Sequence, residues 1–134
     1  MLNHPKFKAH HIGCLTEDIT QSLLHYKSLG FESISEIYPI AAQKVNVCFV
    51  EIQSNFYLEL VEFHPENAAL KRIFKNSNPY YHVGYLTENV PTAIKMLENE
   101  GFRLVNQFNS EAFKNKLCAF LYSPEMHLIE LIEA

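Results

Sequence analysis

The chain has 134 residues, of which 48% are hydrophobic and 19% charged, and its formal net charge is −4 at pH 7. This length and composition are typical of a globular protein with a sizeable core. The charge disfavours nucleic acid as a partner, and no apolar run approaches the roughly 18 residues of a membrane span.

Cysteine usage indicates the compartment. Cys14, Cys48 and Cys118 are scattered through apolar segments. An odd number without metal-site spacing favours free, buried thiols in a reducing environment. The first six residues, MLNHPK, have no apolar signal-peptide core. We therefore expect a cytoplasmic protein.

The first half of the chain predicts four strands and a helix. Alternating residues favour a strand at 7–16, and the next segment begins a helix at Asp18 and ends it at Gly30. The remaining strands are expected at 31–40, 44–52 and 56–63. A short connecting helix is expected at about 67–76.

The second half predicts the same order. A strand at 80–87 leads to a helix that Asn89 caps, with Pro91 in its first turn and Gly101 after its end. The three strands that follow are expected at about 102–108, 116–122 and 126–133.

The two halves are copies of one unit. Residues 11–31 and 82–102 align without a gap at an offset of 71 and share seven identities in 21 positions. The offset also aligns LELVE at 58–62 with IELIE at 129–133. Such self-similarity determines the architecture. We expect an α+β protein in which two tandem βαβββ modules form a cupped mixed sheet with helices on the outside.

Neither module can cover both faces of its own sheet, so we expect one domain over residues 1–134. Module one would cover about 7–64, and module two about 79–134.

Four polar residues recur at equivalent mid-strand positions: His11 and His82, and Glu59 and Glu130. A carboxylate with apolar neighbours on a strand face is costly unless it is paired or binds a metal. A pseudo-twofold arrangement would bring two imidazoles and two carboxylates together. That N₂O₂ set suits a borderline divalent ion and leaves positions open for water or substrate.

Other polar residues fit this pattern less well. His10 is aligned with Tyr81 and breaks the repeat. Glu62 and Glu133 recur at the same offset, but alternation puts them on the opposite strand face from Glu59 and Glu130. We expect both to be rim or surface charges.

At these four residues the sequence resembles the vicinal oxygen chelate superfamily, which includes glyoxalase I, bleomycin resistance proteins and dioxygenases. The HxG motif and the later glutamate occur in both modules, and the resemblance covers almost the whole chain. It is strongest to the short branch of lactoylglutathione-lyase-like proteins and methylmalonyl-CoA epimerases.

The resemblance implies one divalent metal ion (Zn, Ni, Co or Mn) bound by His11, Glu59, His82 and Glu130. It implies a lyase or isomerase that moves a proton through a metal-stabilised enediolate on a small 2-oxo thiohemiacetal. Glu130 is the first choice for the catalytic base and Glu59 the second. A homodimer is expected, with modules paired within one chain or across the dimer.

Two alternatives stay open, a methylmalonyl-CoA-epimerase-like thioester epimerase and a non-catalytic module that sequesters a small molecule such as an antibiotic. Similar epimerases usually have glutamine where Glu59 stands, and an acidic base where this chain has Ala41-Ala42-Gln43. The complete ligand set is unusual for a sequestering module.

Overall fold

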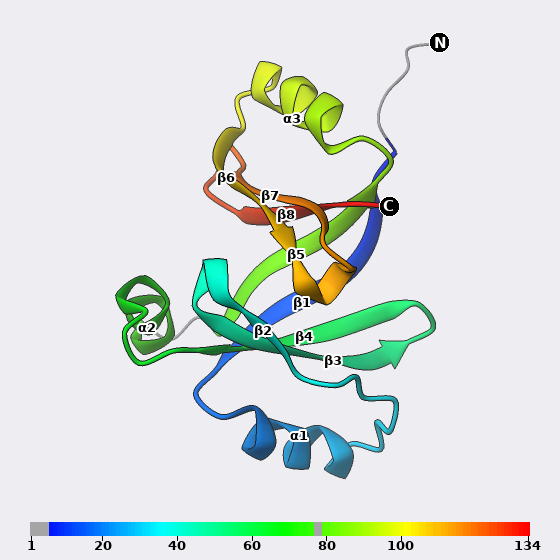
Figure 1. Ribbon diagram of the computed structural model, residues 1–134, viewed down its shortest axis with the longest axis vertical. Helices are drawn as coiled ribbons and strands as arrows, with labels where there is room; N and C mark the ends of the chain where they lie inside the picture. The colour runs from blue at the N-terminus through cyan, green and yellow to red at the C-terminus, as the bar shows by residue number, and fades with distance from the viewer. Residues whose placement is uncertain (1–5, 77–78) are drawn as a thin grey trace. The chain divides into compact units, whose positions relative to one another are not determined.

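The computed structural model describes residues 6–76 and 79–134. The prediction that residues 1–6 lack a signal-peptide core therefore falls almost entirely outside the described residues. Two βαβββ modules follow one another along the chain (Figure 1). The first consists of β1 (Lys8–Thr16), α1 (Ile19–Ser28), β2 (Tyr38–Ile40), β3 (Val45–Gln53) and β4 (Phe56–Phe63). The second consists of β5 (Tyr80–Thr87), α3 (Val90–Asn99), β6 (Arg103–Ser110), β7 (Lys116–Tyr122) and β8 (Leu128–Glu133).

Three shorter elements complete the chain: α2 (Ala68–Lys75) between the modules, and the 3-10 turns η1 (Ala41–Gln43) and η2 (Glu111–Phe113). The α+β class and the two tandem modules are confirmed. The described residues form two compact units, one within 11–81 and the other made of 82–134 with 6–10.

Each unit has its own mixed four-stranded arrangement. The strand order is β2-β3-β4-β1 in the first and β5-β8-β7-β6 in the second. The pairs β1–β4 and β5–β8 are parallel, and the other pairs within each unit are antiparallel. A helix returns the chain after the first strand of each module, as a parallel connection requires.

Helices α1 and α3 each cover one face of their sheet (Figure 1). Asp18 caps α1 and Asn89 caps α3 by accepting a hydrogen bond from a backbone N–H three residues later. Gly30 and Gly101 follow the helices with φ of +96° and +93°, a conformation that other residues adopt only with strain.

The buried apolar side chains of each module lie between its helix and its sheet. In the first, Ile19 packs with Cys14, Cys48, Val50, Leu58 and Leu60. In the second, Val90, Ala93, Ile94 and Leu97 pack with Ala119, Leu121 and Leu131. Side chains alternate along the strands, so His11 and Glu59 lie together on the face of the first sheet that is turned away from α1. His82 and Glu130 lie in the same way on the face of the second sheet that is turned away from α3.

The predicted strand at 31–40 is wrong except for its last three residues. Ile34 makes only an isolated bridge with Val50. At the next position the Phe49 N–H donates to the Ser35 hydroxyl, not to a backbone carbonyl, at 2.9 Å. This side chain takes the place of a ladder bond, so the regular pairing begins only at Tyr38.

Glu62 and Glu133 are half-buried, and both make a contact that the sequence did not predict. Glu62 accepts a hydrogen bond from the Ile19 N–H and Glu133 from the Val90 N–H, both at 2.9 Å. Each carboxylate thus binds the first N–H of its module's helix, where the helix dipole favours negative charge.

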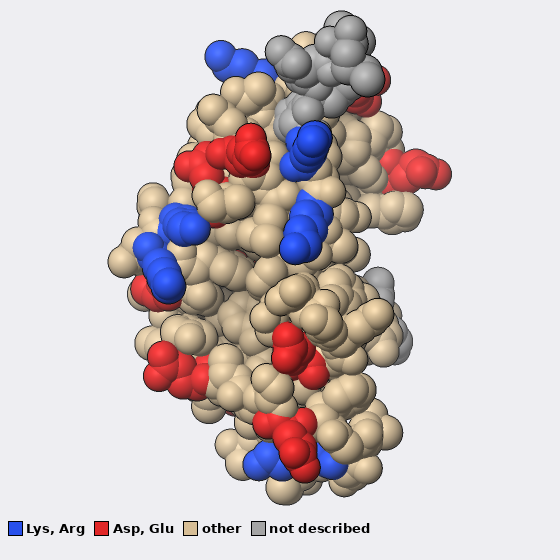
Figure 2. All heavy atoms as spheres, turned by 90° about the vertical axis from the view of Figure 1, so that its right-hand side faces the viewer, with Lys and Arg blue, Asp and Glu red and all other residues tan. Residues whose placement is uncertain are grey.

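No described helix has the length and hydropathy needed to cross a membrane. The face in Figure 2 carries both basic and acidic side chains, and uncharged surface separates most of them.

Candidate metal centre

Each predicted histidine lies two residues before a glycine that pairs with a predicted glutamate. Gly13 of β1 is opposite Glu59 of β4, and Gly84 of β5 is opposite Glu130 of β8. Glycine contributes no side chain, so the histidine two residues before it can reach the glutamate across that face. Both modules use the same register to bring an imidazole to a carboxylate.

The two pairs have almost the same dimensions. His11 Nε2 lies 3.4 Å from Glu59 Oε1, and His82 Nε2 lies 3.3 Å from Glu130 Oε1. His11 is 0% exposed, and the other three side chains are also buried. Removing these polar groups from water is costly, so their burial needs compensation.

A phenylalanine stands beside each pair. Phe49 of β3 is opposite Glu59, and Phe120 of β7 is opposite Glu130. Their rings meet the imidazoles edge-on, with centroids 5.9 Å apart for His11–Phe49 and 5.2 Å for His82–Phe120. These contacts orient the imidazoles and exclude water. Neither phenylalanine was predicted to belong to the site, although the two are also 71 positions apart.

The spacing within each pair fits two ligands of one ion. A charge-assisted N–H···O bond is normally about 2.7–2.9 Å long, so 3.3–3.4 Å is long for a direct bond. Two donors that each lie about 2.1 Å from an ion, at 90–109° to one another, are about 3.0–3.4 Å apart. Within the described parts of the chain, each of these two buried pairs could supply ligands to a metal ion.

Cys14 lies on the other face of the sheet, one residue after the glycine opposite Glu59. Burial, and then the charge of Glu59, raise the pKa of the Cys14 thiol to about 12. The thiol is therefore protonated at neutral pH and is a poor nucleophile or metal ligand.

His10, the neighbour of His11, contacts a different residue, because alternation turns its side chain to the other face. Its ring meets Phe113 edge-on at a centroid distance of 5.4 Å. This placement agrees with its exclusion from the predicted ligand set.

Comparison with known proteins gives the family. The family model of the glyoxalase/bleomycin resistance protein/dioxygenase superfamily matches residues 10–122. A search among curated proteins found no match.

Several solved structures share the fold. A hypothetical protein from Bacillus halodurans is 24% identical, with a TM-score of 0.83 over 96% of this chain and 95% of that one. Methylmalonyl-CoA epimerase from Mycobacterium tuberculosis is 18% identical, with a TM-score of 0.81 over 93% and 86%. A Streptomyces coelicolor methylmalonyl-CoA epimerase variant in complex with 2-nitronate-propionyl-CoA is 22% identical, with a TM-score of 0.81 over 95% and 94%.

The family match covers most of the chain and both copies of the HxG motif. It confirms the resemblance drawn from the sequence. The chain belongs to the glyoxalase/bleomycin resistance protein/dioxygenase superfamily.

Proposed function

We propose that this protein is a metal-dependent lyase or isomerase of the glyoxalase I type, acting on a small 2-oxo thiohemiacetal. The observation that supports this is the buried His–Glu pair repeated at 3.4 and 3.3 Å in the two modules. In this proposal residues 1–134 form one domain, and His11, Glu59, His82 and Glu130 together bind one divalent ion. Zn, Ni, Co and Mn all accept such ligands.

The proposed reaction transfers a proton next to a carbonyl group. A bound divalent ion would stabilise the negative charge that develops on a substrate oxygen when the α-proton leaves. Glu130 accepts that proton and returns it to the neighbouring carbon, and Glu59 is the second candidate for this role. The histidines present Nε2, while Phe49 and Phe120 exclude water from the carboxylates.

A thioester epimerase is the second candidate because solved methylmalonyl-CoA epimerases share this fold. Epimerisation needs a base on each face of the substrate carbon. The turn at Ala41–Gln43 supplies no ionisable side chain, so Glu59 and Glu130 would have to act as the two bases. The third candidate, a sequestering module, would bind a small molecule without turnover.

The proposal includes a cytoplasmic homodimer. The three cysteines are free and buried, which fits a reducing compartment. Light scattering after size exclusion checks the dimer.

Proton exchange in deuterium oxide tests the reaction. Protein loaded separately with Zn, Ni, Co or Mn is incubated with the methylglyoxal–glutathione hemithioacetal or with methylmalonyl-CoA, and NMR follows the α-proton. We expect turnover of the hemithioacetal. Glu130→Gln should lower kcat about 100-fold or more while much of the metal is retained. Glu133→Gln, on the same strand but bonded to Val90, should stay within about threefold.

The outcomes separate the candidates. Exchange restricted to methylmalonyl-CoA would establish the epimerase. Metal-loaded protein that exchanges neither substrate would refute proton transfer.

A further inference from the structure

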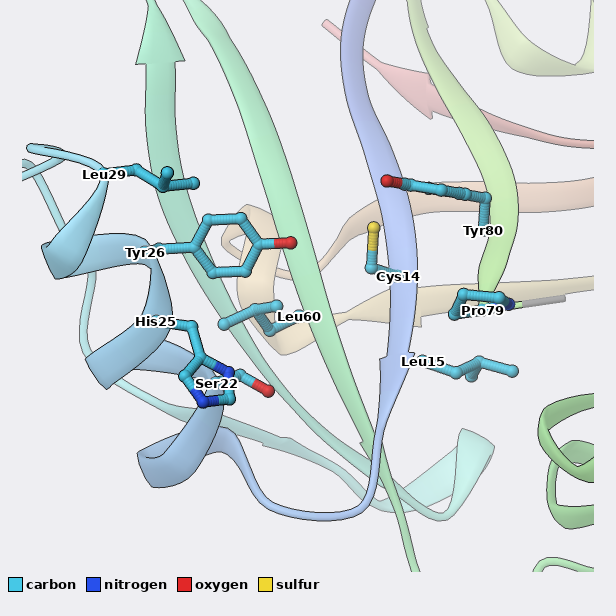
Figure 3. Close-up of a pocket in the computed structure, with 9 residues that line it drawn as sticks. All are labelled: Cys14, Leu15, Ser22, His25, Tyr26, Leu29, Leu60, Pro79 and Tyr80. Atoms are coloured by element: carbon cyan, nitrogen blue, oxygen red, sulfur yellow. The ribbon is translucent and has the colours of Figure 1, made fainter. Parts of the chain in front are cut away.

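A pocket of about 290 Å³ lies on the α1 side of the first sheet, away from the face that carries His11 and Glu59 (Figure 3). Its lining comes from β1, α1, β4 and the start of β5. The residues are Cys14, Leu15, Ser22, His25, Tyr26, Leu29, Leu60, Pro79 and Tyr80. This lining contains no Lys, Arg, Asp or Glu, so it suits a ligand without net charge.

Polar atoms gather at one side of the pocket. Figure 3 shows the hydroxyl groups of Tyr26 and Tyr80 pointing toward the side where the Cys14 thiol lies. Burial, followed by the nearby Cys14 and Tyr80, raises the pKa of the Tyr26 phenol, which agrees with this placement. Three neutral groups that can donate or accept hydrogen bonds therefore converge there.

The second module has different residues at two of the positions that line this pocket. At the 71-residue offset, Tyr85 takes the place of Cys14 and Leu97 takes the place of Tyr26. Tyr85 and Leu97 pack together in the core between α3 and its sheet. A small residue at position 14 thus leaves in the first module a space that a large ring fills in the second.

The wall formed by Pro79 and Tyr80 is held in place, because the Leu15 N–H donates to the Pro79 carbonyl at 2.7 Å. The rim is apolar and open to solvent: Leu29 is 69% exposed and Tyr80 is 62% exposed. Exposed apolar residues around a concave surface are typical of binding sites.

We propose that this pocket binds a neutral aromatic molecule of about two fused rings that carries a hydroxyl group. The size follows from the volume, since a cavity of about 150 Å³ holds benzene and this one is about twice as large. The rings would contact Leu29, Leu60 and Tyr80, and the hydroxyl would lie among Cys14, Tyr26 and Tyr80. This inference is independent of the proposed metal chemistry.

Titration with 2-naphthol at pH 8 tests the proposal, by calorimetry and by the probe's own fluorescence. We expect one site per chain. Leu29→Ala should weaken binding about fivefold or more. Leu24→Ala is the matched control, because Leu24 is on α1, which Leu29 directly follows, and is 53% exposed but does not line the pocket. It should change the Kd less than twofold.

Two further measurements make the test decisive. Tyr80→Ala removes an exposed wall with little risk to folding and should also weaken binding about fivefold or more. Cys14→Tyr copies the second module and should abolish binding. EDTA should have no effect. The proposal is overturned if wild-type protein does not bind the probe, if Leu24→Ala and Leu29→Ala act alike, or if chelation abolishes binding.

Discussion

The Glu62 carboxylate accepts a hydrogen bond from the backbone N–H of Ile19 at 2.9 Å and so joins the end of β4 to the start of α1. Its second oxygen accepts from the Asn46 side chain at 3.0 Å. Glu133 binds Val90 in the same way, but Leu117 stands where the repeat places the counterpart of Asn46.

Removing these carboxylates should destabilise both modules to different degrees. Glu62→Ala is expected to lower the free energy of unfolding by about 1–2 kcal/mol, because it leaves the Ile19 N–H and the Asn46 amide without their acceptor. Glu133→Ala should cost about 1 kcal/mol. Urea denaturation measures both values, and a larger loss for Glu133→Ala would contradict the account of Asn46.

Thr16 and Thr87 occupy equivalent positions in the two modules, but removing their hydroxyl groups should change the stability in opposite directions. Thr16 Oγ1 bonds the Ser22 hydroxyl at 2.7 Å and accepts from the Asp18 N–H at 3.1 Å. Thr87 Oγ1 is buried without a partner among the described residues. Thr16→Val should therefore destabilise the protein by about 1 kcal/mol. Thr87→Val should stabilise it by a similar amount. Thermal unfolding of the two variants compares them directly, and loss of stability in both would refute the assignment.

Alkaline pH should destabilise the protein through Cys14, whose thiol pKa is raised from 9.0 to about 12 by burial and by Glu59. The folded state holds this proton more tightly than the unfolded chain. The stabilisation is therefore complete below pH 9 and is lost as the pH rises toward 12. Urea denaturation between pH 8 and 11 should show a shallower decline for Cys14→Ala. Equal slopes would contradict the prediction.

Substitution of the two adjacent histidines of β1, His10 and His11, should change the metal affinity to different degrees. His11→Ala is expected to lower affinity about 100-fold or more, since loss of an outer partner of a ligand already costs 10–100-fold. His10→Ala should change it little, because its ring contacts Phe113. Competition with a chromophoric chelator gives both values. Similar losses in the two variants would exclude His11 as a ligand.

Much of this fold could be predicted because the sequence contains two copies of the module, and each helix or strand expected in one copy could be checked against the other. The Asp18 and Asn89 caps and the Gly30 and Gly101 ends were identified from residue type alone. The segment before Tyr38 was not, because Ser35 substitutes its side chain for a ladder bond. A pattern of apolar residues carries no information about that exchange.

The choice of one histidine and one glutamate in each module followed from alternation and the shared offset. The helix-capping role of Glu62 did not, because it depends on how β4 and α1 approach each other in space. The pocket beside α1 was not foreseen either. The pocket depends on the small side chain of Cys14 at a position where the second module has the aromatic ring of Tyr85. This difference becomes apparent only when the packing of the two modules is compared.

Gly13 and Gly84 are the residues directly opposite Glu59 and Glu130. Any larger residue there would place its own β-carbon beside the carboxylate and compete with the imidazole for that space. Alanine at either position could therefore abolish ion binding with all four ligands intact. A mutational survey limited to ionisable residues would overlook the two positions that create room for them.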